Sequence, residues 1–128
     1  IHPNPAEIMK YKKLIAPELA LFTDIQVKHK TMITPRPLSE SAKFAIGHGS
    51  DALIVTGVST GIETPLQKIK EVKEVVSEFP VLVGAGVHEG NVFEQLSVAD
   101  GAIVGTSIKS GANVDREKAA RLVSSLTR

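Results

Sequence analysis

The sequence predicts an α/β fold of the (β/α) TIM-barrel type, here with about four βα units in 128 residues. Short apolar runs alternate with amphipathic stretches of helical spacing, and no shift in composition marks a linker within the single expected domain, 1–128. The last three runs are apolar on both faces, which is typical of parallel strands covered by helices. This alternation also allows an open doubly wound sheet, but glycines and hydroxyls after the strands favour a barrel, which carries its ligand groups there.

Each element has its own local signal, in the order α and then βα four times. Pro17 ends the first helix, Ser39 can cap the second and Asp115 can cap the last. Thr64 is expected as an N-cap with Pro65 at the first helical position. The expected strands are the apolar runs 19–27, 52–56, 81–84 and 101–105. The expected helices are 5–17, 39–47, 65–79, 91–98 and 115–126.

The loops after the last two expected strands carry the strongest functional signal. The segments "VGAGV" (83–87) and "VGTSIKSG" (104–111) stand where many barrels share one phosphate site between two loops. Glycines remove side chains where backbone must approach an anion, and hydroxyls add donors at the start of a short helix. The alternative is that the glycines only permit tight turns. The predicted phosphate-binding residues are Gly84, Ala85, Gly86, Gly105, Thr106 and Ser107.

The first expected strand ends in polar residues. Period two along "TDIQVKHK" places Asp24, Gln26 and Lys28 on one face and Ile25 on the other, and we expect the polar face to point into the barrel. Asp24 and Lys28 then form an internal ion pair, or they are catalytic. In the catalytic reading Asp24 is a general acid or base, and Lys28 holds an anion or forms a Schiff base. His29 is a third catalytic candidate, although alternation turns it to the opposite face, where it could simply bond to backbone.

The second expected strand ends in "IVTGVSTG" (54–61), which contains two Thr-Gly pairs. Thr56, Gly57, Thr60 and Gly61 suit a ligand hydroxyl or a phosphate oxygen, and the alternative is a simple turn. The lysines of the expected helices are interpreted as solvated: Lys10, Lys12, Lys13, Lys68, Lys70 and Lys73.

Composition excludes several function classes. With 15 basic and 14 acidic residues the net charge is +1, which argues against a nucleic-acid partner. No cysteine is present, which removes disulfides and zinc-thiolate sites, and His48 and His88 have no partners at metal-ligand spacing. Glu89 stands where a G-x-G-x-x-G fingerprint needs glycine, so the Rossmann reading is weak; no metal or cofactor is expected. The sequence shows no membrane-spanning run or leader, so a cytoplasmic protein is expected.

The length fits half a barrel, because eight βα units take about 250 residues. We therefore expect the C-terminal half of a longer barrel, or two copies that close one barrel between them. An isolated half would expose its sheet edges and one side of its core. The expected partners are accordingly a second copy or an N-terminal half-barrel. The interior residues that need this cover are predicted to include Val81, Val83, Ala102 and Val104.

Four segments together resemble the BtpA family, also called BtpA/SgcQ: "TDIQVKHK", "DALIVTGVSTG", "PVLVGAGVHEGN" and "ADGAIVGTSIK". The resemblance runs from about Asp24 to Lys109 and implies a TIM barrel related to phosphate-binding barrels. It also implies that the N-terminal half-barrel of a full family member is missing here. Gln26 stands where relatives often carry histidine or an aromatic residue, and Ala85 where serine is common.

Two classes of function are expected from these observations. An enzyme would act on a small phosphorylated metabolite, such as a sugar phosphate or a nucleotide-like compound, with phosphate or sulfate held between the last two loops. The resemblance implies the alternative, a non-enzymatic assembly or stability factor, because one branch of the family is named for photosystem I biogenesis. A third reading is a fragment that is inactive alone.

Overall fold

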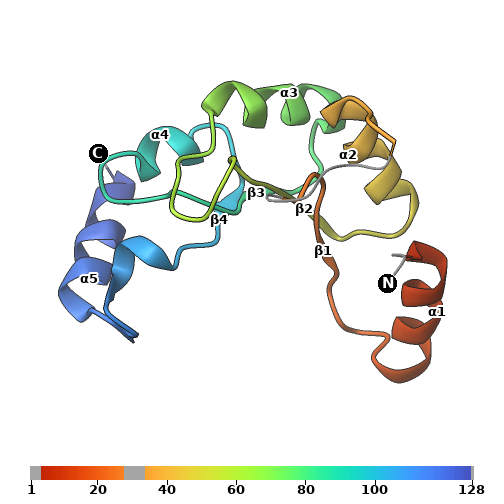
Figure 1. Cartoon of the computed structure of the whole chain (residues 1–128), viewed down its shortest axis with the longest axis horizontal. Helices are drawn as coiled ribbons and strands as arrows, with labels where there is room; N and C mark the ends of the chain where they lie inside the picture. The colour runs from red at the N-terminus through yellow and green to blue at the C-terminus, as the bar shows by residue number, and fades with distance from the viewer. Residues whose placement is uncertain (1–3, 28–33, 128) are drawn as a thin grey trace.

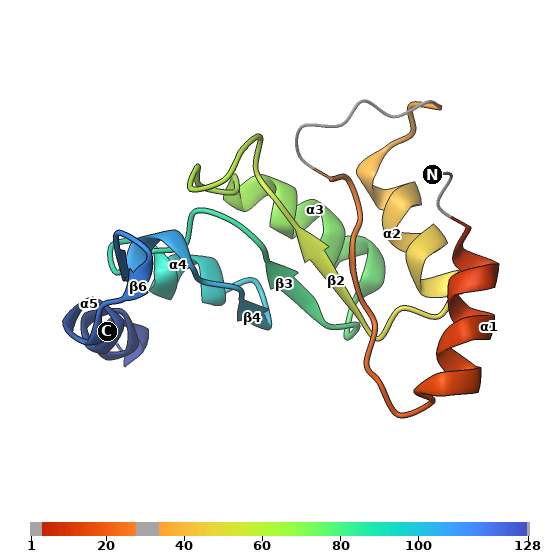
Figure 2. The same cartoon turned by 60° about the horizontal axis from the view of Figure 1, so that its bottom comes forward.

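The computed structural model describes residues 4–27 and 34–127. Its centre is a sheet of four parallel strands in the order β1-β2-β3-β4. Figure 1 shows an arch in which α2, α3 and α4 lie along the outer side of the sheet, and Figure 2 shows the same arrangement turned by 60°. No helix of the described residues lies over the inner side of the sheet. The strands are β1 (Phe22–Asp24), β2 (Ala52–Val55), β3 (Val81–Val83) and β4 (Gly101–Ala102). The α-helices are α1 (Pro5–Ile15), α2 (Leu38–Gly47), α3 (Leu66–Val76), α4 (Val92–Leu96) and α5 (Arg116–Ser124).

The alternation of strands and helices confirms the predicted α/β class, and the parallel order is that of a partial barrel. The strands are shorter than the apolar runs that predict them. A 3₁₀ helix, η1 (Thr106–Ile108), follows β4, and a second one, η2 (Ser125–Thr127), follows α5. An antiparallel hairpin of β5 (Lys109–Ser110) and β6 (Asn113–Val114) precedes α5. The hairpin was not predicted, because strands of two residues are too short to show a period.

The helix caps agree with the sequence in one case and differ in two. Asp115 caps α5, accepting hydrogen bonds from the backbone N–H groups of residues 117 and 118. The bond from Lys118 and a hydrogen bond from the Ser110 hydroxyl are the main causes that hold the pKa of Asp115 below its ordinary value. The N-cap positions of α2 and α3 are held by Pro37 and Pro65, not by Ser39 and Thr64 as predicted. Pro65 has ψ 129°, which is extended, so α3 begins one residue later than expected.

The core lies between the sheet and the helices, and this corrects the predicted facing of β3. Val81 and Val83 are fully buried in this core, and Ala102 and Val104 pack against its edge. They point toward the helices, not toward the barrel interior as predicted from the sequence. The inner face instead carries Ile54 and Leu82 in register, with Phe22 and Ile103 about half exposed (51% and 48%). The predicted apolar interior therefore exists, but with different residues.

Two of the lysines predicted to be solvated, both on α3, contact residues next to the ends of β2 and β4. Lys68 Nζ donates to the Thr56 carbonyl at 2.8 Å, and Lys73 Nζ lies 2.9 Å from the Asp100 carboxylate. Asp100 also accepts a 2.8 Å hydrogen bond from the backbone N–H of Val81. Desolvation pushes the pKa of Asp100 upward, but the hydrogen bonds from Val81 and Lys73 outweigh it and leave the pKa below its ordinary value. Asp100 thus fixes the start of β3 against the chain that leads into β4.

Candidate functional site

A cleft of about 380 Å³ lies at the carboxyl ends of the strands, where three loops meet. We call it the loop cleft. Its walls come from the β3–α4 loop (84–91), the segment from the end of β4 into η1 (103–107) and the tip of the β2–α3 loop. The structure brings all six predicted phosphate-loop residues to this cleft, together with Thr60 and Gly61. The complete lining is Thr60, Gly61, Gly84, Ala85, Gly86, Val87, His88, Ile103, Val104, Gly105, Thr106 and Ser107.

Three consecutive carbonyl groups hold the β3–α4 loop in place. Each accepts a hydrogen bond from a side chain of a different part of the chain: the β2–α3 loop, the residue before α4, and η1. In a trans peptide the N–H of the next residue points the opposite way from the carbonyl. The bonds to the carbonyls of residues 85–87 therefore also fix the direction of the N–H groups of residues 86–88. The bonds are Thr64 Oγ1 to Ala85 O (3.1 Å), Asn91 Nδ2 to Gly86 O (3.0 Å) and Ser107 Oγ to Val87 O (2.7 Å).

The same loops present backbone donors that the protein does not use. In the parts of the chain that the structure describes, two runs of three consecutive N–H groups around the loop cleft donate no hydrogen bond. Backbone N–H groups in such loops form anion-binding concavities, because each carries a partial positive charge. The six belong to Ala85, Gly86, Val87, Gly105, Thr106 and Ser107.

Two glycines of the loop cleft, Gly86 and Gly105, have different structural roles. Gly86 has φ +73°, and a Cβ there would lie 2.3 Å from the Glu63 Cα, so this glycine lets two loops pack together. A Cβ at Gly105 would meet no atom of the described residues within 4 Å. Gly105 is thus the position where bare backbone borders open space.

Two of the four predicted residues of the β2–α3 loop lie away from the cleft. Thr56 is buried on the inner face, where its hydroxyl lies 3.5 Å from the Asp24 carboxylate as a long hydrogen bond. Gly57 packs against the backbone of Glu63, whose carbonyl oxygen would lie 2.9 Å from a Cβ. The lack of a side chain at Gly57 therefore makes room for the backbone of Glu63, not for a ligand. Thr60 and Gly61 do line the cleft.

The candidate catalytic residues are only partly described. Asp24 pairs in register with Ile54 and shares the inner face with it, while Ile25 is buried and belongs to the core cluster. Gln26 does not join Asp24 there, because β1 ends at Asp24 and the Gln26 amide turns to the Ser41 hydroxyl of α2 at 3.4 Å. The expected inward-facing set of three is wrong for Gln26. Lys28 and His29 lie outside the described residues.

The sequence did not predict two side chains that hold the loops of the cleft without lining it, Gln95 and Asn91. Gln95 on α4 is 1% exposed, and its Nε2 donates to the Thr64 carbonyl and to the Glu63 carboxylate, both at 3.0 Å. Asn91 accepts the N–H of His88 at 2.9 Å while its own amide donates to Gly86. The sequence does not indicate the Gln95 contacts, since they join α4 to the distant β2–α3 loop. The position of Asn91 just before a helix is the one available signal.

Within residues 4–27 and 34–127, no three His, Asp or Glu side chains gather as metal ligands. In the same ranges, no helix has the length and apolar character needed to cross a membrane.

The sequence of the chain is similar to those of known proteins. The model of the BtpA family matches residues 1–128. An uncharacterized protein of Archaeoglobus fulgidus is 40% identical over 117 residues, which cover 91% of this chain and 46% of that protein. The photosystem I biogenesis protein BtpA of Synechocystis is 27% identical over 116 residues, which cover 90% of this chain and 40% of that protein. The chain therefore spans less than half the length of these two relatives.

Two solved structures from Pyrococcus furiosus share the fold. The thiamine phosphate pyrophosphorylase superposes with a TM-score of 0.66 at 22% identity, over 92% of this chain and 54% of that one. The N-(5'-phosphoribosyl)anthranilate isomerase superposes with a TM-score of 0.63 at 17% identity, over 95% of this chain and 56% of that one. Both are TIM-barrel-type enzymes, and at these identities the likeness establishes the fold alone.

Proposed function

The chain belongs to the BtpA family, and we propose that its loop cleft binds the phosphate group of a small phosphorylated metabolite, such as a sugar phosphate or a nucleotide-like compound. The observation that carries the proposal is the set of six unused backbone N–H groups on two neighbouring loops. Because hydrogen bonds to the carbonyls of Ala85 and Gly86 orient the N–H groups of Gly86 and Val87, these two donors need little rearrangement to meet an anion. The two structural neighbours support it, since their names refer to a thiamine phosphate and a phosphoribosyl compound.

The inner face of the sheet supplies the place for a reaction. Asp24 lies there beside the buried hydroxyl of Thr56, at the same end of the strands as the loop cleft. A metabolite with its phosphate in the cleft would extend over this face. In this proposal Asp24 is the general acid or base, and Lys28 and His29 remain catalytic candidates from the following segment.

The open side of the arch needs a second half-barrel. Ile54, Leu82 and Ile103 leave apolar surface on the inner face, and β1 and β4 have free edges within the described sheet. Burying a side chain of this size contributes about 1.5–3 kcal/mol, which favours association. The proposed partner is either a second copy of this chain or an N-terminal half-barrel, each of which would supply four more strands.

The non-enzymatic alternative has one observation in its favour, the name of the Synechocystis relative. An assembly or stability factor of that kind would use the barrel as a scaffold, and the loop cleft would have no ligand. An inactive piece of a longer barrel would give the same result. Both alternatives predict that phosphate compounds do not bind.

Phosphate binding is tested by calorimetric titration of the purified chain with glycerol 3-phosphate, comparing Gly105→Asp with Gly105→Asn. Either side chain enters open space, and the two have nearly the same shape, so the difference between them is charge. We expect the aspartate to abolish binding by repulsion and the asparagine to weaken it less. Equal affinities in the two variants, or no binding by the unsubstituted chain, would overturn the proposal.

A further inference from the structure

A second cavity adjoins the loop cleft. It has a volume of about 290 Å³ and lies between the β3–α4 loop and α5; we call it the α5 cavity. His88 and Ser107 line both cavities, so the two are neighbours across these side chains. The other walls are Glu89, Lys118, Arg121 and Leu122.

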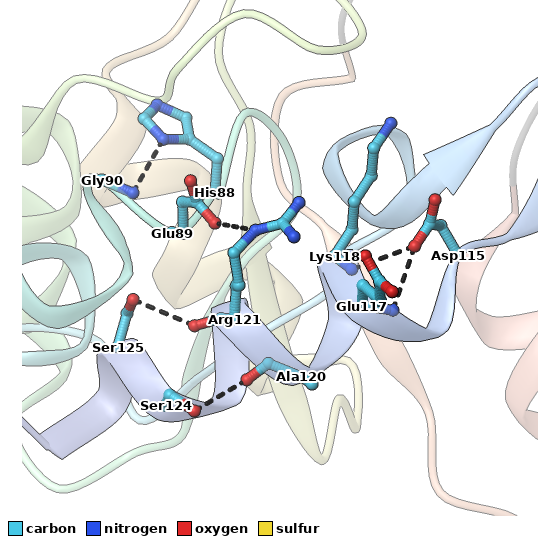
Figure 3. Close-up of polar contacts among 10 residues, drawn as sticks. All are labelled: His88, Glu89, Gly90, Asp115, Glu117, Lys118, Ala120, Arg121, Ser124 and Ser125. Atoms are coloured by element: carbon cyan, nitrogen blue, oxygen red, sulfur yellow. Dashed lines mark hydrogen bonds and ion pairs between the residues drawn. The ribbon is translucent and has the colours of Figure 1, made fainter.

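Two positively charged side chains from one face of α5 line the α5 cavity. Lys118 and Arg121 are three residues apart, which places them on the same side of the helix, and Figure 3 shows both rising from α5. Lys118 Nζ donates to a neutral acceptor, the Lys109 carbonyl, at 2.7 Å. The wall of the α5 cavity thus carries two positively charged side chains, Lys118 and Arg121, and one negatively charged side chain, Glu89.

The one carboxylate in the wall is weakly held. Glu89 Oε2 lies 3.0 Å from Arg121 Nε, and Figure 3 shows this single contact bridging the loop and the helix. Both side chains are about half exposed (53% and 54%), and exposed ion pairs of this kind contribute little stability. The contact also uses Nε alone, so the two terminal nitrogens of the guanidinium keep their donors for another acid. A ligand carboxylate can exchange with Glu89 at small cost.

His88 offers a further donor at the boundary of the two cavities. Its Nδ1 accepts the N–H of Gly90 at 3.1 Å, so in the neutral ring the proton is on Nε2. A ligand that crosses from the loop cleft to the α5 cavity would pass this nitrogen.

We propose that the α5 cavity is a second anion subsite, which makes the ligand a compound with two acidic groups: a phosphate in the loop cleft and a carboxylate or second phosphate at Arg121 and Lys118. The inference rests on the proposed phosphate function and adds the class of substrate to it.

The test compares two compounds that share a phosphate and differ by a carboxylate. Calorimetric titration at low salt measures the affinity of the purified chain for 3-phosphoglycerate and for glycerol 3-phosphate. We expect 3-phosphoglycerate to bind about fivefold more tightly, the value of one exposed ion pair. Arg121→Gln should remove this preference and leave the affinity for glycerol 3-phosphate unchanged.

Arg116→Gln is the matched control, because it removes the same charge from an exposed position of α5 that lines neither cavity. It should keep the preference. Glu89→Gln should strengthen binding of 3-phosphoglycerate alone, because it removes the competing carboxylate. If glycerol 3-phosphate binds and the wild-type chain shows no preference, or if both arginine variants lose it equally, the subsite is refuted and the phosphate site stands. If neither compound binds, the proposed function itself fails and the subsite fails with it.

Discussion

Replacing Thr64 by valine isolates one of the hydrogen bonds that hold the β3–α4 loop. Thr64 has no exposed surface, and its hydroxyl donates to the Ala85 carbonyl at 3.1 Å. Valine has nearly the same shape, so the change removes the donor and leaves a buried carbonyl without a partner. An unsatisfied buried group of this kind costs about 1–3 kcal/mol. We expect the free energy of unfolding of Thr64→Val to fall by about that amount.

Urea unfolding followed by circular dichroism, at one fixed protein concentration, measures this loss. Glycerol 3-phosphate affinity should fall as well, by about tenfold, because the peptide that follows Ala85 loses its fixed orientation. Thr64→Ser is the control: it loses a methyl group and some stability, but it keeps the donor and should keep the affinity. An unfolding midpoint for valine equal to that of the wild type, or equal loss of affinity in the two variants, would refute the role given to this hydroxyl.

Three further outcomes are expected. Gly86→Ala should destabilise the chain by about 1–3 kcal/mol from its positive φ alone, and by more from the contact with Glu63; an unchanged melting temperature would contradict this packing. Asp100, whose pKa is lowered in the fold, adds stability that is complete above its ordinary pKa of 3.8 and is lost as the pH falls through the lower folded value. Asp100→Asn should therefore weaken this part of the acid unfolding curve, and an acid limb identical to the wild type would argue against it. Light scattering should find the purified chain associated, and a monodisperse monomer with cooperative unfolding would contradict the half-barrel.

The sequence predicted the features that have a local cause. Asp115 caps α5 because a carboxylate next to the first helical N–H groups needs no distant partner. The predicted glycine and hydroxyl residues after β3 and β4 likewise lie at one cleft, since the end of a strand fixes where its loop begins. The facing of Val81 and Val83 could not be read, because a strand that is apolar on both faces has no alternation to distinguish helix side from interior. Thr64 was misassigned for a related reason: its hydroxyl suits a cap, and only the folded chain offers it the Ala85 carbonyl.

The contacts of the β3–α4 loop also explain why the candidate site depends on residues outside the cleft. Thr64 and Asn91 do not line the loop cleft, yet each holds a carbonyl whose neighbouring N–H does. Gln95 in turn holds the backbone of Thr64 from α4, which makes a chain of buried hydrogen bonds behind the loop. Donors fixed in this way lose little freedom when an anion arrives, so more of the interaction energy remains for binding. The affinity for phosphate should therefore respond to substitutions in this supporting layer as strongly as to substitutions in the cleft wall.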